Sequence, residues 1–462
     1  MTISASDRTS TAGADSGRAD SDVARLTGIR AIKTAVAVGF PPVASGVIAR
    51  RRTAMSLLEK INADSVAIDT VDELRAEFGS GPVELVLPGR TVVLILDADD
   101  AARILDETPS SFTPANREKR GALRPFQPRG VLISDRPGRN YRRPVNEAAL
   151  ETPDALHSMS GRFAAVIDDE IGELAVEARR AGELNASSFT RAWWRAVRRI
   201  TLGDAARDDS AVTDQLWSLR ANGNWSYFFP ARTRARERFF DRLYEYAEEV
   251  EPNTLLAALD SRTTGAATDP VGQIPHWLFA FDAAGIATIR SFALLASHDE
   301  RMKEAKHEVS GVDSRAPHPL PFLRSCILES LRLWPTTPAI LRDSTIDTAW
   351  GARKQRIDAG SAFLIYTPAF HRDRRSVSYA DAFEPDVWMD GRAAKQRAFL
   401  PFSSGAAGCP GRNVALFTSS TTLARLVEHF PDHHQISTPR LDSHKPMPAT
   451  FDHFGLTFEA AP

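Results

Sequence analysis

Apolar and polar positions divide the chain into a short strand-rich part and several long helical runs. Short apolar bursts on both sides of a Pro-Gly-Arg turn predict a β-hairpin over 83–96, and a short helix is predicted to follow over 98–105. Helical periodicity extends over about 155–250, with a break at the aromatic stretch 221–230. The pattern therefore predicts a mainly α fold with a minor β portion.

Three later apolar-periodic runs complete the helical part, at 275–297, 321–333 and 414–430. Short strands and turns are expected between the last two runs. Residues 112–130 contain three prolines and many arginines, and we expect them to be irregular. The chain shows no internal repeat.

The run 276–290 is apolar almost all round, which is typical of a buried helix. Within it Ala280, Ala284 and Thr288 are four residues apart, so they form one stripe of small side chains that ends in a hydroxyl. Such a stripe would let a flat cofactor and a substrate lie against the helix. The alternative is a face of small residues for helix–helix packing.

The N-terminal end differs from the remainder in composition. Residues 1–22 are rich in Ser, Thr, Ala, Asp and Gly, so we predict a disordered tail ahead of a single domain over 23–462. The tail lacks the apolar core of a signal peptide. The apolar stretch 34–49 is interrupted by Pro41 and Pro42 and is shorter than the roughly 20 residues of a spanning helix. We expect no transmembrane segment and a cytoplasmic protein.

Charge and cysteine content narrow the function. The 57 basic and 59 acidic residues nearly balance, so we expect no nucleic acid partner. The chain has two cysteines, Cys326 and Cys409, which excludes a disulfide framework and suits a reducing cytosol. Their wide separation argues against a structural zinc site.

The segment 399–411 reads Phe-Leu-Pro-Phe-Ser-Ser-Gly-Ala-Ala-Gly-Cys-Pro-Gly and contains the candidate metal ligand, Cys409. Its glycines allow a tight turn and a close approach to a flat ligand. A helical run begins after Gly411, so Cys409 precedes a helix N-terminus, where the dipole and backbone N–H groups favour a thiolate. A thiolate in an apolar, glycine-lined loop suits the axial ligand of a haem iron. The alternative is a buried, inert cysteine.

Phe402, Gly405, Cys409 and Gly411 match the Phe-x-x-Gly-x-x-x-Cys-x-Gly motif, and the chain resembles the cytochrome P450 family. The resemblance implies that Cys409 is the proximal ligand of haem b. One departure is Ala407, since the family usually has Arg or His there to pair with a haem propionate.

A second similarity is the Glu-x-x-Arg pair, Glu329 and Arg332, which lie three apart among apolar residues. A buried pair needs further hydrogen bonds, and the family's pair braces the segment beneath the haem. The family adds a third partner, an Arg from a later segment. Val387 occupies that position here, so the third partner is left open.

The apolar helix also matches, because Ala284, Gly285 and Thr288 resemble the family's oxygen-binding motif, whose threonine steadies iron-bound oxygen and its protons. Ala287 stands where the family has an acid. Asp282 cannot replace that acid, because six residues on a helix turn it about 240° from Thr288 at roughly 100° per residue.

Haem propionates need cations. Arg139 and Arg143 lie four apart on one predicted helix face, in a segment that resembles the family's His-x-x-x-Arg, and Arg342 resembles its other propionate arginine. For each arginine a solvated surface position is the alternative. Together they are candidates to compensate for Ala407.

The resemblance spans about 83–430 and implies a cytochrome P450 fold with haem buried between two helices. It implies a monomeric monooxygenase that inserts one oxygen atom from O₂ into a small lipophilic substrate, such as a secondary metabolite, fatty acid or terpenoid. No Gly-rich dinucleotide motif is present, so ferredoxin and ferredoxin reductase would supply electrons.

Two other functions stay open: different haem-thiolate chemistry, as in a peroxygenase or isomerase, and a haem-binding sensor or carrier without turnover. The aromatic residues of 225–229 are either a lid over the substrate channel or a loop packed on the core.

Overall fold

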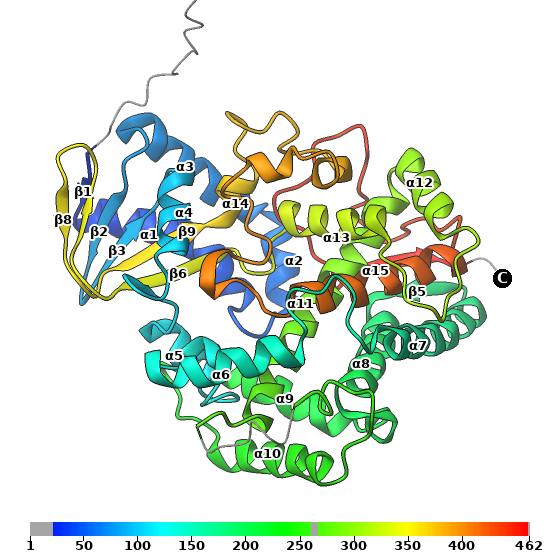
Figure 1. Cartoon of the computed structure of the whole chain (residues 1–462). Helices are drawn as coiled ribbons and strands as arrows, with labels where there is room; N and C mark the ends of the chain where they lie inside the picture. The colour runs from blue at the N-terminus through cyan, green and yellow to red at the C-terminus, as the bar shows by residue number, and fades with distance from the viewer. Residues whose placement is uncertain (1–21, 260–266, 461–462) are drawn as a thin grey trace, which may run out of the picture.

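A six-stranded mixed sheet forms one side of the protein, and the other side is mainly helical (Figure 1). The computed structural model describes residues 22–259 and 267–460, so the expected tail, apart from its last residue, lies outside the described residues. The sheet order is β1-β2-β3-β9-β6-β4. Its strands are β1 (Ala24–Leu26), β2 (Val83–Leu87), β3 (Arg90–Leu94), β9 (Ala362–Tyr366), β6 (Ala339–Ser344) and β4 (Phe112–Thr113).

The hairpin predicted over 83–96 is present. β2 and β3 pair antiparallel from Val83 opposite Leu94 to Leu87 opposite Arg90, and Gly89 takes a positive φ of 71° in the turn. β9 pairs parallel to β3 and antiparallel to β6. Two further pairs are β5 (Glu183–Asn185) with β10 (Thr457–Glu459) and β7 (Thr348–Trp350) with β8 (Gln355–Ile357).

The expected mainly α fold with a minor β portion is confirmed. The helices before residue 260 are α1 (Gly28–Ser45), α2 (Arg52–Lys60), α3 (Ala63–Phe78), α4 (Ala98–Asp106), α5 (Arg117–Leu123), α6 (Arg136–Ala149), α7 (Ser160–Ala181), α8 (Ala186–Leu202), α9 (Ser210–Gly223) and α10 (Thr233–Glu248). Those after residue 266 are α11 (Ile274–Ala296), α12 (Asp299–Val309), α13 (Pro321–Leu333), α14 (Thr367–His371) and α15 (Arg412–His429).

One sequence prediction was wrong in part. Residues 112–130 are not irregular throughout, because they contain β4 and the helix α5. Asn116 explains the start of α5, since its side chain accepts a hydrogen bond from the Lys119 N–H. The prolines flank this helix and do not interrupt it.

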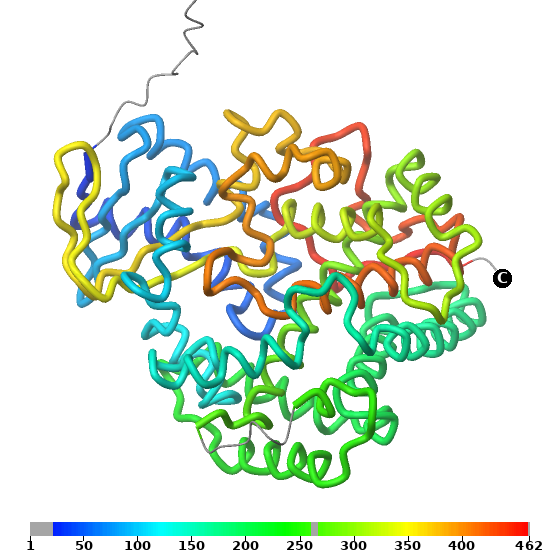
Figure 2. The backbone as a smooth tube through the Cα atoms, in the orientation of Figure 1, coloured from blue at the N-terminus to red at the C-terminus, as the bar shows by residue number. Residues whose placement is uncertain are grey.

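α11 runs through the centre of the helical part (Figures 1 and 2). It packs against α8, α13 and α15, and most of its residues are buried on every side. Among the described residues, the span Val271–Ala296 is the one that is long and apolar enough to cross a membrane, yet 78% of its apolar window is buried inside the protein. Such burial is that of a core helix.

Candidate functional site

The loop around Cys409 is closed by its own backbone. The Cys409 N–H donates to the Phe402 carbonyl at 3.0 Å, and the Gly411 N–H donates to the Cys409 sulfur. Gly405 has φ +65°, and a Cβ there would lie 2.2 Å from the carbonyl oxygen of Leu105 in α4. Both the conformation and this close approach therefore require glycine. Cys409 thus lies in a preformed turn directly before α15.

The Cys409 thiol has a raised pKa, because burial outweighs the Gly411 N–H and the charges of Arg143 and Arg412. The expected thiolate at the helix N-terminus is therefore not favoured by the protein alone. A metal ion bound to the sulfur reverses this balance, since its charge favours the thiolate. Cys326 is fully buried in α13 with a pKa well above its usual value, as fits an inert core thiol.

The Glu329–Arg332 pair in α13 is completely buried, with both side chains 0% exposed. Arg332 binds both carboxylate oxygens, at 2.7 and 2.8 Å. Its remaining N–H groups donate to the carbonyls of His371 at 3.0 Å, Ala380 at 2.8 Å and Ala382 at 2.8 Å. A buried pair satisfied in this way fixes α13 to the segment 371–382.

The third partner of this pair, left open by the sequence, is Trp388. Its indole N–H donates to Glu329 Oε2 at 2.9 Å, and the Glu384 N–H donates to Oε1 at 3.0 Å. Val387 is fully buried and contributes no donor. The sequence could have indicated Trp388, because its indole N–H is a donor one residue after the position where the family has Arg.

Thr288 and Ala284 lie together on α11. The Thr288 hydroxyl donates to the Ala284 carbonyl at 2.9 Å, and Ser419 of α15 reaches the same oxygen at 3.5 Å. One turn earlier, Ala280 is exposed and Ala283 half-buried, although most of their helix is buried. Helix packing therefore does not cover the whole small-residue stripe.

Gly285 has a packing role on the same helix. A Cβ at Gly285 would lie 2.7 Å from Nε1 of Trp193, which donates to the Phe281 carbonyl at 2.9 Å. For this residue the helix-packing alternative is the better explanation. Asp282 binds Arg220 at 2.5 Å, as expected for a side chain that points away from Thr288.

The three arginines expected at the propionates all lie near the cysteine loop. Arg139 and Arg143 extend from α6 and donate to the loop carbonyls of Ala406 at 2.9 Å and Gly408 at 2.8 Å. Arg342 lies on β6 and donates to the Ser403 hydroxyl at 3.3 Å. The structure thus brings three separate segments to one loop.

Arg342 is poorly compensated. It is 3% exposed and its Nε has no hydrogen-bond partner. Burial and the charge of Arg139 lower the pKa of Arg342 to about 10. Within residues 22–259 and 267–460, no carboxylate forms an ion pair with Arg139 or Arg342.

Lys119 is a further buried cation, close to Arg342. Its ammonium donates to the Leu341 carbonyl at 2.8 Å, and burial together with Arg342 lowers its pKa well below the usual value. No sequence signal singled out Lys119. Arg139, Arg342 and Lys119 are suited to bind the carboxylates of a ligand whose metal is bound by Cys409. The residues present therefore fit haem, which has two propionates.

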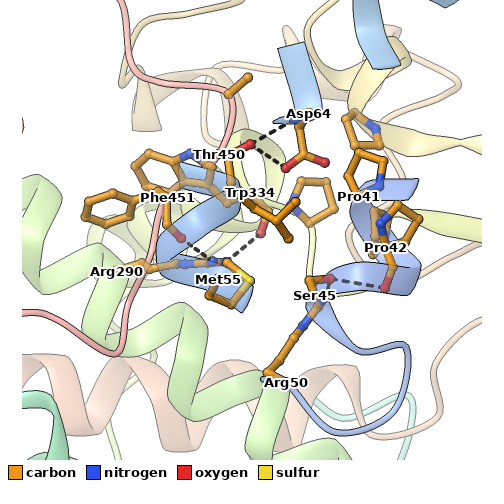
Figure 3. A pocket seen from close by; sticks show the side chains of 15 residues that line it. Pro41, Pro42, Ser45, Arg50, Met55, Asp64, Arg290, Trp334, Thr450 and Phe451 are labelled. Atoms are coloured by element: carbon orange, nitrogen blue, oxygen red, sulfur yellow. Dashed lines mark hydrogen bonds between the residues drawn. The ribbon is translucent and has the colours of Figure 1, made fainter. Parts of the chain in front are cut away.

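A separate cavity of about 40 Å³ lies at the C-terminal half of α11 (Figure 3). Arg290 enters it from α11, and Arg50 enters it from the loop after α1. Arg290 donates to the carbonyls of Phe451 at 2.7 Å and Trp334 at 3.3 Å. Asp64 also lines the cavity and accepts the Thr450 hydroxyl at 2.7 Å. The volume is enough for roughly two or three water molecules.

Comparison with known proteins agrees with this geometry. The family model described as Cytochrome P450 matches residues 286–451, which include Thr288, Glu329, Arg332 and Cys409. Residues 286–451 therefore match a cytochrome P450. Members of the family bind haem b, and the arrangement around Cys409 fits that group.

Individual relatives of the chain match only in part. The Bacillus subtilis (strain 168) bifunctional cytochrome P450/NADPH–P450 reductase 2 is 29% identical over 34% of the chain and 16% of its own length. The Streptomyces melanosporofaciens cyclooctat-9-en-7-ol 5-monooxygenase is 29% identical over 38% and 41%. Cytochrome P450 714C3 of Oryza sativa subsp. japonica is 25% identical over 60% and 58%. The chain thus spans less than two thirds of each of these relatives.

Proposed function

We propose that the protein is a haem-thiolate monooxygenase (EC 1.14) that inserts one oxygen atom from O₂ into a small lipophilic molecule. The observation that carries the proposal is Cys409, held by the Gly411 N–H in a closed loop. Beside this loop lie Arg139 and Arg342, which form no ion pair with a carboxylate among the described residues. Haem bound through Cys409 would supply the iron chemistry that activates oxygen. Arg139, Arg342 and Lys119 would hold its propionates.

The polypeptide's own contribution lies on α11. Thr288 donates its hydroxyl proton to the Ala284 carbonyl, so its oxygen lone pairs stay available to accept a hydrogen bond from a proton donor. Ala287 brings no acid to this face, so ordered water or polar groups of the substrate carry protons to Thr288. The partly exposed Ala280 and Ala283 leave room for an apolar substrate.

The test of this function begins at the cysteine. The carbon monoxide complex of the reduced protein should show the strongly red-shifted Soret band of a thiolate-bound haem. Cys409→Ser should abolish that band, whereas Cys326→Ser should keep it. A normal band in Cys409→Ser would overturn the proposal.

Turnover tests the role of Thr288. Thr288→Ala should raise hydrogen peroxide release per NAD(P)H consumed while haem content and the carbon monoxide spectrum stay unchanged. Unchanged coupling with the true substrate would favour the second candidate, a peroxygenase or isomerase, which the absence of an acid at Ala287 also favours. Efficient peroxide-driven turnover without a reductase would identify a peroxygenase.

We also propose a cytoplasmic monomer that takes electrons from a ferredoxin and its reductase. Arg412 directly follows the cysteine loop and is exposed, and Arg142 precedes Arg143, which binds that loop, so a small acidic protein would be attracted there. Haem reduction by ferredoxin should slow as ionic strength rises, since such charges are screened over roughly 10 Å at 0.1 M. A rate independent of salt would exclude this docking surface.

A further inference from the structure

The cavity at the C-terminal half of α11 is lined by two arginines and lies outside the cysteine loop (Figure 3). Arg290 extends from α11, and Arg50 comes from the loop 46–51, which follows α1. Arg290 is buried and Arg50 is half-buried. The volume of about 40 Å³ leaves space for a few atoms, not for an organic substrate.

Among the described residues, Arg290 donates only to neutral acceptors. Its terminal nitrogens bind the carbonyls of Phe451 at 2.7 Å and Trp334 at 3.3 Å. Its Nε is buried and has no hydrogen-bond partner. Burial and, after it, the positive charge of Arg50 lower the pKa of Arg290 to about 9. Arg290 therefore has the same deficit as Arg342, in another part of the molecule.

Arg50 is in a similar position. Its guanidinium donates to the Ser45 hydroxyl at 2.6 Å and to the Thr336 carbonyl at 2.8 Å. Burial lowers the pKa of Arg50, although nearby carboxylates attract its charge. Within residues 22–259 and 267–460, neither Arg50 nor Arg290 forms an ion pair with a carboxylate. The two positive charges therefore repel each other beside one cavity.

The carboxylates that attract Arg50 are held by other groups. Asp64 lines the cavity, but Tyr366 donates to its Oδ1 at 2.9 Å and Thr450 donates to its Oδ2 at 2.7 Å. Asp282, farther along α11, is paired with Arg220 at 2.5 Å. These carboxylates reduce the electrostatic repulsion at a distance and supply no hydrogen-bond acceptor to Arg50.

The titratable groups near Arg290 also leave it without a contact. Asp452 and Glu59 attract its charge from outside the cavity lining, and the Asp452 N–H donates to Glu59 Oε1 at 2.8 Å. His453 is 6% exposed, and its Nδ1 has no hydrogen-bond partner. Burial, followed by the charges of Arg290 and Arg50, lowers the pKa of His453 well below its usual value. His453 is therefore neutral and adds no charge.

We propose that this cavity binds one small monovalent anion, such as a halide, between Arg50 and Arg290. The anion would accept hydrogen bonds from guanidinium N–H groups and would offset the repulsion between the two positive charges. Water could satisfy the hydrogen bonds, but it would leave the repulsion in place. The bound anion would join the loop 46–51 to α11, so it would stabilise the folded protein.

The first experiment uses bromide, which scatters X-rays anomalously. Crystals of the haem-loaded full chain, grown without chloride and soaked in sodium bromide, should show an anomalous peak between the guanidinium groups of Arg50 and Arg290. In solution, bromide titrated against gluconate at constant ionic strength should raise the unfolding midpoint in a saturable way. Gluconate serves as the reference because it is too large for the cavity.

Two variants connect this binding to the arginines. Arg290→Lys keeps a positive charge but lacks the Nε donor, and Arg50→Met removes the second cation. Each should weaken bromide binding at least about tenfold, because a charge-assisted hydrogen bond is lost. The control is Arg191→Met, which removes an exposed arginine paired with Glu177 and should bind bromide like the wild type. All three variants should keep the carbon monoxide spectrum.

The wild-type crystal decides the question even if a variant fails to fold. Bromide peaks confined to the protein surface, an adventitious ion only, would overturn the proposal and leave a water-filled cavity. Wild-type affinity in both Arg290→Lys and Arg50→Met would overturn it as well. The readouts do not depend on haem chemistry, so failure here would leave the monooxygenase proposal unchanged.

Discussion

Two buried arginines near the cysteine loop differ in how their charge is satisfied. Arg332 is 0% exposed and binds the carboxylate of Glu329 through Nε and Nη2. Its other N–H groups donate to the carbonyls of His371, Ala380 and Ala382. Arg342 is 3% exposed, has an Nε without a hydrogen-bond partner and lies near Arg139. In the part of the chain that the structure describes, no carboxylate forms an ion pair with it. The polypeptide satisfies the charge and the hydrogen bonds of Arg332, whereas it leaves those of Arg342 partly unsatisfied.

This difference distinguishes residues that stabilise the fold from residues whose partner is a bound ligand. A buried charge with all its partners contributes to a unique structure, whereas a buried charge without them costs stability. A protein can keep an uncompensated buried charge when a bound ligand compensates it. The Arg342 cluster therefore tells more about the bound group than the Glu-x-x-Arg pair does.

The largest expected effect is at the satisfied pair. Arg332→Met leaves the Glu329 carboxylate buried without its cation, so the unfolding free energy should fall by about 3–5 kcal/mol. Urea unfolding of the variant measures this loss. The control is Arg191→Met, which breaks an exposed pair with Glu177 and should cost no more than about 1 kcal/mol. Equal losses in both variants would show that burial of the pair is unimportant.

A change at the unsatisfied arginine should have the opposite pattern. Arg342→Leu removes an uncompensated cation, so the haem-free protein should be as stable as the wild type or more stable. Haem should dissociate about ten to a hundred times faster, because a charge-assisted hydrogen bond of about 1.5–3 kcal/mol is lost. Transfer of haem to an excess of apomyoglobin measures that rate. Loss of stability without faster dissociation would make Arg342 a structural residue.

Local chemistry explains why some of this could be predicted from the sequence. Cys409, Glu329 and Arg332 stand in fixed spacings, and the hairpin 83–96 follows from alternation around a turn. Trp388 and Lys119 could not be found in this way, because their roles depend on contacts with Glu329 and Arg342 across 59 and 223 residues.

A smaller loss is expected at the replacement partner of the pair. Trp388→Phe keeps the aromatic packing and removes the indole N–H that binds Glu329, so the unfolding free energy should fall by about 1–3 kcal/mol. The same urea titration applies, with Trp217→Phe as a control at a 41% exposed indole. If Trp388→Phe is as stable as the control variant, Glu329 is satisfied by the Arg332 guanidinium and the Glu384 N–H alone.

The smallest effect concerns Lys119 and depends on pH. Burial and Arg342 lower its pKa well below the usual value, so the unfolded chain binds this proton more tightly than the folded protein. The unfolding free energy should therefore rise with pH between the lowered pKa and the ordinary pKa of about 10.4. Lys119→Met removes this contribution, so in haem-free protein the stability of wild type relative to Lys119→Met should increase with pH over that range.

With haem bound, a propionate beside Arg342 raises the pKa of Lys119 and flattens the difference. Urea unfolding of both proteins, with and without haem, at several pH values tests this. Parallel curves in the haem-free proteins would mean that Lys119 keeps its ordinary pKa. If haem does not change the pH dependence of the stability difference, the propionates do not lie beside Lys119. Arg342 would then not be a propionate ligand.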